Sequence, residues 1–169
     1  MRLTMYTDYT LRVMMYLAVR YQDQGVATIE EMATAYDISR NHLMKIVNEL
    51  SQTGFIETTR GRSGGARLAR APETISIGAV VRMAEKDFAV VACHDASTPH
   101  NCAIYQACNL KRGLARAMDA FMQELDKMTL QDAISAPTVA ADLLGMERPV
   151  ALPVSTRARA PAKAGRARS

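Results

Sequence analysis

Two short amphipathic segments followed by a glycine-rich stretch, between residues 28 and 70, constrain the fold more than any other part of the chain. Thr28-Ile29-Glu30-Glu31 has the Ser/Thr-x-x-Glu form of a capping box, which predicts a helix from Ile29. Ser39 can cap the next helix, from Arg40 to about Gln52, in which apolar residues recur at helical spacing. Two short helices joined by a tight turn predict a helix-turn-helix.

The residues after the second of these helices predict a wing. Phe55 to Thr59 has the composition of a strand, Arg60-Gly61-Arg62-Ser63-Gly64-Gly65 that of a tight turn, and Ala66 to Ala69 that of a returning strand. Residues 39–70 contain six basic and two acidic side chains, a net charge of +4. A basic patch on a winged helix-turn-helix favours DNA as the partner.

The second helix of a helix-turn-helix places its first residues in the major groove. Arginine can pair with guanine and asparagine with adenine in bidentate fashion, so this helix can read bases as well as bind phosphate. Basic residues of the wing can neutralise phosphates or enter the minor groove. The predicted DNA-binding residues are Thr28, Ser39, Arg40, Asn41, His42, Lys45, Arg60, Arg62, Ser63 and Arg67. The alternative is a winged helix that binds another protein through the same charges.

The remaining periodic segments are helical. The first spans Thr7 to about Gln22 with Thr7 as its cap, and Ser76 can cap another from Ile77 to about Glu85. The longest, Asn109 to Met128, carries one apolar stripe, for which the same helix of a second subunit is the expected partner. The residues of this stripe are Leu110, Leu114, Ala117, Met118, Phe121, Leu125 and Met128. Val139 to Met146 predicts a short amphipathic turn.

The predicted fold class is therefore mainly α with a small β-hairpin wing. It consists of a winged helix-turn-helix domain (1–86), a cysteine loop (87–108), a dimerisation helix with a short C-terminal helix (109–146) and a flexible basic tail (147–169).

The charge of +4 comes from the tail. Residues 147–169 hold six basic residues and one acidic residue, whereas the rest of the chain holds 15 basic and 16 acidic residues. DNA binding must therefore depend on local clustering of charge. The first ten residues lack the apolar region of a secretory signal, and no apolar run is long enough to span a membrane, so a cytoplasmic protein without a membrane partner is expected.

All three cysteines lie between Cys93 and Cys108, with the spacing Cys-x8-Cys-x5-Cys. This spacing differs from the short knuckles of structural zinc, and iron-sulfur clusters tolerate wider gaps. Either metal site wants a fourth ligand, from His94, His100, Asp95, another part of the fold, a partner subunit or a small molecule. Three ordinary thiols, a redox disulfide and a zinc-stabilised interaction module are the alternatives.

Catalysis has little support, because no phosphate loop, Ser/His/Asp set or carboxylate pair stands in a recognisable context. An enzyme is not expected. Asp8, by spacing alone, is a first-turn acid that pairs with Arg12 one helical turn later.

From Met1 to about Ile134, the chain resembles the Rrf2 superfamily of bacterial winged-helix iron-sulfur regulators, and within it the nitric-oxide-sensing NsrR branch. The resemblance is carried by the stretches Met1-Arg2-Leu3-Thr4, Tyr6-Thr7-Asp8-Tyr9, Leu11-Arg12, Ser39-Arg40-Asn41-His42, Lys45-Ile46, the wing turn, and Cys102 through Ala107-Cys108 to Leu110-Lys111.

This resemblance implies a homodimeric repressor of a palindromic operator. It implies an iron-sulfur cluster in each subunit, 4Fe-4S in preference to 2Fe-2S, held by Cys93, Cys102 and Cys108. It also makes Asp8 a candidate fourth ligand that reaches the cluster of the other subunit, with nitric oxide as the signal. The histidine ligand that the IscR branch has three residues after the last cysteine is replaced by Lys111.

The first cysteine gap, of eight residues, is wider than in the NsrR branch and is similar to that of the iron-responsive RirA branch. An iron- or redox-responsive regulator is therefore the second expectation for the signal. The tail after Met146 has no counterpart in the resemblance.

Overall fold

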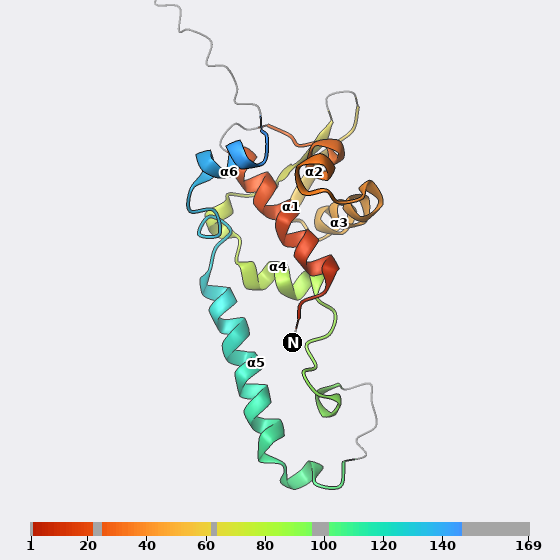
Figure 1. The fold of residues 1–169 in the computed structure, drawn as a ribbon, viewed down its shortest axis with the longest axis vertical. Coiled ribbons are helices and arrows are strands. Elements are labelled where there is room, and N and C mark those ends of the chain that lie inside the picture. The colour runs from red at the N-terminus through yellow and green to blue at the C-terminus, as the bar shows by residue number, and fades with distance from the viewer. Residues whose placement is uncertain (1, 22–24, 62–63, 96–101, 147–169) are drawn as a thin grey trace, which may run out of the picture.

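Figure 1 shows the computed structural model of the chain, which describes residues 2–21, 25–61, 64–95 and 102–146. A mainly helical fold with one antiparallel hairpin is confirmed. The elements in order are α1 (Met5–Tyr21), α2 (Ile29–Tyr36), α3 (Arg40–Gln52), β1 (Ile56–Thr59), β2 (Gly65–Leu68), α4 (Ile77–Ala84), α5 (Asn109–Lys127) and α6 (Pro137–Leu143), with single 3₁₀ turns η1 (Pro72–Thr74), η2 (Ala92–His94) and η3 (Tyr105–Ala107).

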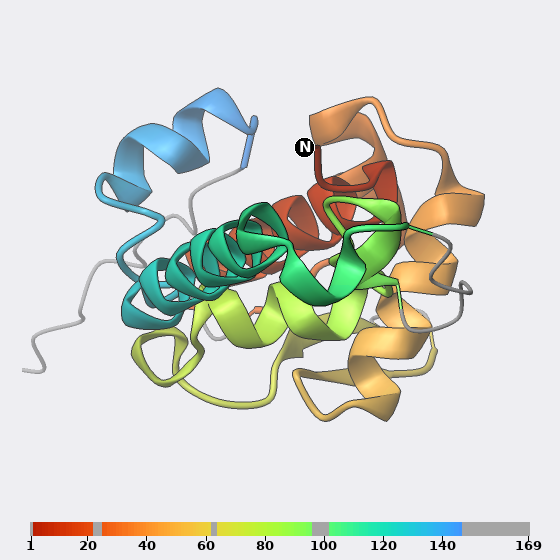
Figure 2. The same ribbon diagram turned by 90° about the horizontal axis from the view of Figure 1, so that it is seen from below.

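Helix α1 is the centre of the core. It contacts α2, α3, α4, α6 and β2, and Figures 1 and 2 show α6 on one side of it and the pair α2–α3 on the other. Because neighbours surround it, Val13, Tyr16 and Leu17 are buried as well as part of the face that helical spacing predicts. The residues of that face are Met14, Ala18 and Val19, which are buried, and Leu11 and Met15, which are half-buried. The predicted cap was wrong, because Thr4 precedes the helix and its hydroxyl accepts the Thr7 amide at 3.3 Å.

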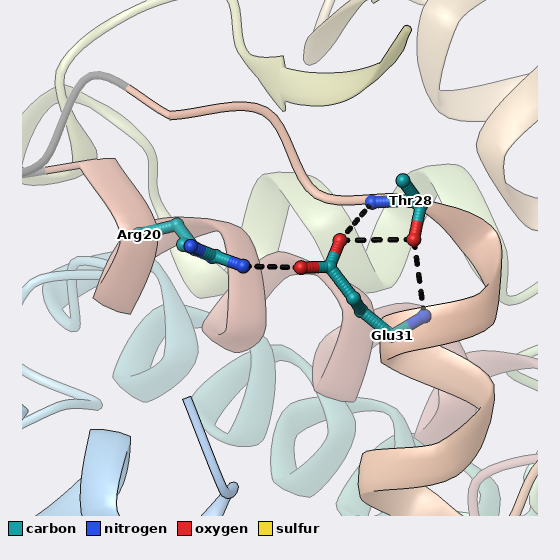
Figure 3. A network of polar contacts seen from close by, with 3 residues as sticks. All are labelled: Arg20, Thr28 and Glu31. Carbon is teal, nitrogen blue, oxygen red and sulfur yellow. Dashed lines mark hydrogen bonds and ion pairs between the residues drawn. The ribbon is translucent and has the colours of Figure 1, made fainter. Parts of the chain in front are cut away.

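The helix-turn-helix follows its local signals. Thr28 and Glu31 form the predicted capping box at the start of α2, and Figure 3 shows that the same Glu31 carboxylate also bonds Arg20 of α1. Helix α2 ends at Asp37 in the left-handed conformation, and the Ser39 hydroxyl caps α3. The starts of both helices are therefore fixed by side chains of their own segments, and α2 ends where the Asp37 backbone amide donates to the Ala33 carbonyl.

The wing is joined to the helix-turn-helix through the backbone. Strands β1 and β2 pair in antiparallel register, with Ile56 opposite Leu68 and Thr59 opposite Gly65. The residue before the α2 cap, Ala27, exchanges two backbone hydrogen bonds of 2.8 Å with Ala66 of β2. A Cβ on Gly65 would lie 2.7 Å from the Ala27 carbonyl oxygen, so this close approach requires glycine.

The C-terminal end of helix α5 is joined to α4. The Ile77 amide bonds the Met128 carbonyl at 2.9 Å, and the Arg82 and Asp126 side chains pair bidentately across α4 and α5. Gly78 allows this approach, because a Cβ there would lie 3.0 Å from the Asp126 amide nitrogen. From this junction α5 runs away from the body, with η3 at its far end (Figure 1).

Only part of the apolar stripe of α5 packs on the chain's own core. Its inner edge packs on the chain's own core through Met118, Phe121 and Leu125, and Met122, which lies outside the predicted stripe, is the buried residue of the helix. The other edge stays open, with Leu110 70% and Met128 40% exposed. The expectation that a second subunit covers the whole stripe was therefore too broad, since part of it belongs to the monomer.

Across the described ranges, no helix is long and apolar enough to cross a membrane.

Candidate DNA-binding face and cysteine site

The first turn of α3 forms an exposed surface. Arg40, Asn41, His42 and Lys45 are all exposed, while Leu43 and Ile46 on the opposite side are buried. Ser39 uses its hydroxyl to accept the His42 amide at 3.4 Å, so it fixes the start of the helix. The helix thus turns the predicted base-reading side chains together toward solvent, as insertion into a major groove requires.

Two of the predicted DNA-binding arginines are paired with carboxylates. Arg40 forms an ion pair with Glu30 of α2. Across the wing, Arg67 donates to one oxygen of Glu57, Oε2, from Nε at 3.0 Å and from Nη2 at 2.7 Å. All four side chains are more than half exposed. Because such exposed pairs contribute little free energy, a phosphate or a base edge can replace the carboxylate.

The other predicted contacts are placed unevenly. Arg60 is exposed at the end of β1, whereas Arg62 and Ser63 lie outside the described residues. The Thr28 hydroxyl donates to the Glu31 carboxylate at 2.9 Å and accepts the Glu31 amide at 3.1 Å, so it is committed to the capping box (Figure 3). The DNA contacts of all ten predicted residues, Thr28 and Ser63 included, remain predictions.

Met44 was missed by the sequence analysis. It is 50% exposed and follows Arg40 by one helical turn on the outward side of α3. An apolar side chain in the major groove can contact the methyl group of thymine. Helical spacing alone could have predicted this position, since residues 40, 41, 44 and 45 share one face of the helix. A selection by charge and polarity omits methionine.

Arg40→Ala is expected to cost roughly 1–3 kcal/mol of operator-binding free energy and to flatten the preference at one base pair. The reason is the loss of a side chain that can bind guanine in bidentate fashion. Binding should be measured against operators that carry each base at that position. Lys45→Ala is the matched comparison, and it should weaken all sequences evenly. Even weakening by Arg40→Ala would mean that this side chain binds only phosphate.

The three cysteines lie outside the core. Cys93 is in η2, Cys102 opens the turn before η3, and Cys108 is the N-cap of α5. All three are free thiols, with Cys102 exposed and the other two partly exposed. The Lys111 amide donates to the Cys108 sulfur at 3.4 Å. Within the described part of the chain, no three His, Cys, Asp or Glu side chains are grouped closely enough to hold a metal ion.

The donor set nevertheless suits an iron-sulfur cluster. Thiolate sulfur is the ligand that these clusters use, and amide hydrogen bonds to sulfur are among the features that tune them. No disulfide or other cysteine engages these thiols. The fit therefore concerns the chemistry of the residues, and the ligand set Cys93, Cys102 and Cys108 remains a proposal.

The candidates for a fourth ligand differ in availability. The His94 ring bonds the Lys111 carbonyl through Nε2 at 3.0 Å, so that nitrogen is committed, and His100 lies outside the described residues. Asp8 forms a half-exposed ion pair with Arg12 at 3.0 Å, as its spacing predicts. Its carboxylate is therefore accessible from outside the chain and has an alternative partner within it.

The start of α1 is fixed by a buried carboxylate. Glu85, at the end of α4, accepts hydrogen bonds from the Thr4 amide at 2.9 Å, the Thr4 hydroxyl at 3.1 Å and the Thr7 hydroxyl at 2.7 Å. Burial acts to raise the pKa of Glu85, but these hydrogen bonds outweigh it and lower the pKa below its ordinary value of 4.5. Glu85 thus connects the turn that carries Asp8 to the segment that leads to Cys93.

Because the folded-state pKa of Glu85 is lowered, its stabilising contribution is present above pH 4.5 and is lost as the pH falls below that value. Glu85→Gln is expected to lower the free energy of unfolding by about 1–3 kcal/mol at pH 7 and by less in acid. Denaturant titrations between pH 3.5 and 7 would measure this. Glu73→Gln, at an exposed glutamate of η1, is the control. An equal loss at every pH would contradict the stated cause.

Two tyrosines connect the same turn of α1 to the recognition helix. The Tyr6 hydroxyl bonds the Glu49 carboxylate, and this burial and contact raise the pKa of Tyr6 strongly. The Tyr9 ring lies 5.9 Å from the His42 ring, between centroids. Residues on both sides of Asp8 therefore touch α3, one near its start and one near its end. Neither contact follows from sequence periodicity.

The sequence profile of the Rrf2 family, described as iron-dependent transcriptional regulators, matches residues 3–136. The chain belongs to the Rrf2 family. It is therefore a DNA-binding transcriptional regulator and not an enzyme.

Curated Rrf2 relatives are similar over nearly their whole length. The HTH-type transcriptional regulator NsrR of Bacillus licheniformis is 47% identical over 134 residues, which cover 79% of this chain and 92% of that protein. NsrR of Bacillus subtilis is 45% identical over 147 residues, which cover 87% of this chain and 99% of that protein. The predicted similarity to the NsrR branch is confirmed.

Solved structures agree with the Rrf2 fold. CymR, described as the global cysteine regulator of Bacillus subtilis, superimposes with a TM-score of 0.64 at 26% identity, covering 80% of this chain and 97% of that chain. IscR of T. potens superimposes with a TM-score of 0.63 at 21% identity, covering 83% and 90%, and this likeness concerns the fold alone.

Proposed function

We propose that this Rrf2 protein is a homodimeric repressor that binds a palindromic operator and releases it in response to nitric oxide through an iron-sulfur cluster in each subunit. The observation that carries the proposal is that three free thiols lie on one segment, from η2 to the start of α5, outside the core of a DNA-binding body. Free cysteines are normally buried and scattered, so such a group needs a ligand to explain it. The identity with NsrR relatives supports the signal.

Cys93, Cys102 and Cys108 would hold the cluster, with Asp8 of the other subunit as the fourth ligand. We favour 4Fe-4S over 2Fe-2S, as the resemblance to the NsrR branch implies. Both cluster types take four ligands, so the number of ligands does not decide between them. When bound, the cluster supplies iron at which nitric oxide reacts. Asp8 offers a hard oxygen among soft sulfur ligands, so its bond should be labile. The nearby Arg12, already 3.0 Å from the Asp8 carboxylate, is ready to take it.

Asp8 can report to DNA through its neighbours on α1. A shift of this turn moves Tyr6 and Tyr9, whose contacts with Glu49 and His42 hold both ends of the recognition helix. In a dimer the spacing of two such helices must match two half-sites, so a small change in their position weakens binding to the palindrome. A complete swing from bound to free requires on the order of 5.5 kcal/mol of differential affinity.

The open edge of the α5 stripe supports the dimer. Leu110 is 70% exposed on this edge, and the chain's own core covers only the opposite one. An exposed apolar strip on a long helix indicates a partner helix, and a symmetric pair of α5 helices would cover it.

The second candidate is an iron-responsive repressor, favoured by the eight-residue gap between Cys93 and Cys102. Both candidates use the same thiols and the same DNA face. They differ only in what releases the operator.

The decisive experiment titrates the anaerobically purified protein, bound to its operator, with nitric oxide, an iron chelator or oxygen. The expected result is that the protein releases the operator at a few molecules of nitric oxide per cluster, and only slowly with the chelator. Release by chelation alone would favour the iron-responsive candidate. A colourless protein with bound zinc would remove both.

Asp8→Ala tests the fourth ligand in the same assay. It should retain a cluster on three thiolates but change the nitric oxide dose for release or the cluster lifetime by about fivefold or more, in line with typical coupling between two sites. Asp119→Ala, an exposed acid on α5, is the control. An unchanged response would leave Asp8 as the ion-pair partner of Arg12.

A further inference from the structure

Lys111, in the first turn of α5, contacts the cysteine loop at several points, although it is not a proposed cluster ligand. Three separate contacts converge on it, one from each part of the loop that the structure describes. They come from His94, Cys108 and Tyr105. Each contact involves a different group of Lys111, so all three are made at once.

The first contact joins the Cys93 turn to α5. The His94 ring nitrogen Nε2 lies 3.0 Å from the Lys111 carbonyl oxygen, across 17 positions of sequence. A carbonyl oxygen only accepts, so Nε2 must carry the proton and donate. Since His94 follows Cys93 directly within η2, this hydrogen bond fixes where the Cys93 turn lies against the helix.

The other two contacts hold the rest of the loop. The Lys111 amide donates to the Cys108 sulfur at 3.4 Å, which fixes that side chain at the helix start. The Lys111 ammonium lies 3.4 Å from the centroid of the Tyr105 ring, in cation–π contact with the η3 turn. That turn lies between Cys102 and Cys108, and the Tyr105 amide bonds the Cys102 carbonyl at 3.0 Å. Lys111 is therefore connected to the backbone near every cysteine.

We propose that His94 and Lys111 are positioning residues that hold the cysteine loop closed before any metal binds, an inference that depends on the proposed cluster site. Neither residue supplies a ligand in this role. Closing the loop between Cys93 and Cys108 costs conformational entropy, and a contact that closes it in the free protein removes that cost from the binding step.

The test uses the metal-free protein first. In a Cys102→Ala background, diamide should oxidise Cys93 and Cys108 to a disulfide, the azo reagent taking up the two electrons and two protons. The rate, followed by intact mass and peptide mapping, measures how often the two thiols meet. His94→Ala should slow it about fivefold or more, and His94→Gln, whose amide can donate to the same carbonyl, should recover part of the loss.

Two controls separate this effect from general damage. His42→Ala makes the same substitution on α3, away from the loop, and should leave the crosslinking rate unchanged. The thermal midpoint of His94→Ala should equal that of the parent, since the contact lies outside the buried core. Lys111→Met keeps the backbone contacts and removes the ammonium, so it should affect the rate less than His94→Ala.

The second arm uses the protein as purified anaerobically, with all three cysteines. His94→Ala should lose iron to a chelator several times faster than the parent and change the visible circular dichroism. If the parent holds no cluster, the proposed function fails, whatever the crosslinking rates. If the parent holds one, and His94→Ala matches it in crosslinking and iron loss, the positioning role is overturned and the proposed function stands.

Discussion

Cys102→Ala is expected to purify without iron or acid-labile sulfide and to lose cluster-dependent operator binding. Cys102 is the exposed member of the three free thiols and is the middle one in sequence, so its removal leaves two sulfur ligands where a cluster needs more. Operator affinity should fall by roughly 10²-fold, up to about 10⁴-fold if the conformational swing is complete. Iron and sulfide assays and a binding titration at fixed salt would measure both effects.

The matched control is Ala103→Ser, which changes the neighbouring exposed residue of the same turn. It should keep the parent's iron content and affinity. Weak binding to unrelated DNA should be the same in all three proteins, because it depends on the basic residues of α3 and the wing. If Cys102→Ala kept full iron content, the ligand set proposed above would be wrong.

Leu114→Glu is expected to convert the proposed dimer to monomers. Leu114 lies on the apolar stripe of α5, beyond the part that packs on the core. Burying a leucine contributes about 1.5–3 kcal/mol. A two-fold interface contains the substitution twice, so the loss is about 3–6 kcal/mol, or roughly 10²- to 10⁴-fold in the dimer dissociation constant. Sedimentation across a concentration series would measure it.

Gln123→Glu introduces the same charge on the opposite side of α5, nine residues and 180° away, at an exposed position. It should leave the dimer intact. A Leu114→Glu monomer should still bind a single half-site weakly, because its recognition helix is unaltered. Unchanged sedimentation of Leu114→Glu would show that α5 is not the subunit interface.

Short-range hydrogen bonds explain which helix starts and which hairpin could be predicted from the sequence. The Thr28 capping box and the Ser39 and Ser76 caps fix three helix starts through hydrogen bonds within a few residues. The predicted bounds of α3 match those in the structure, and the wing pairs in the predicted order. Such signals act between near neighbours, so a single sequence displays them directly.

Contacts between distant segments explain which residue roles could not be predicted from the sequence. Thr7 looked like a cap, but its hydroxyl donates to Glu85, 78 positions later. Met122 lies outside the apolar stripe predicted for α5, but it is buried in the core because α5 packs beside α4. The cysteine spacing predicted a metal, whereas the contacts of His94 with Lys111 depend on how α5 returns beside η2. Hydrophobic periodicity predicts the type of one helix or strand, but it does not predict which other elements pack against it.

The carboxylates that pair with Arg40 and Arg67 also bear on how the protein responds to ionic strength. Binding of a basic side chain to phosphate releases a condensed counterion from DNA, which steepens the salt dependence by about 0.9 per phosphate. When Arg40 or Arg67 leaves its ion pair to bind DNA, however, the carboxylate of Glu30 or Glu57 loses its partner and attracts a cation from solution. The affinity for DNA should therefore decline less steeply with salt concentration than the number of arginines suggests. Because phosphate contacts carry no sequence information, the choice of operator then depends more on base contacts than on charge.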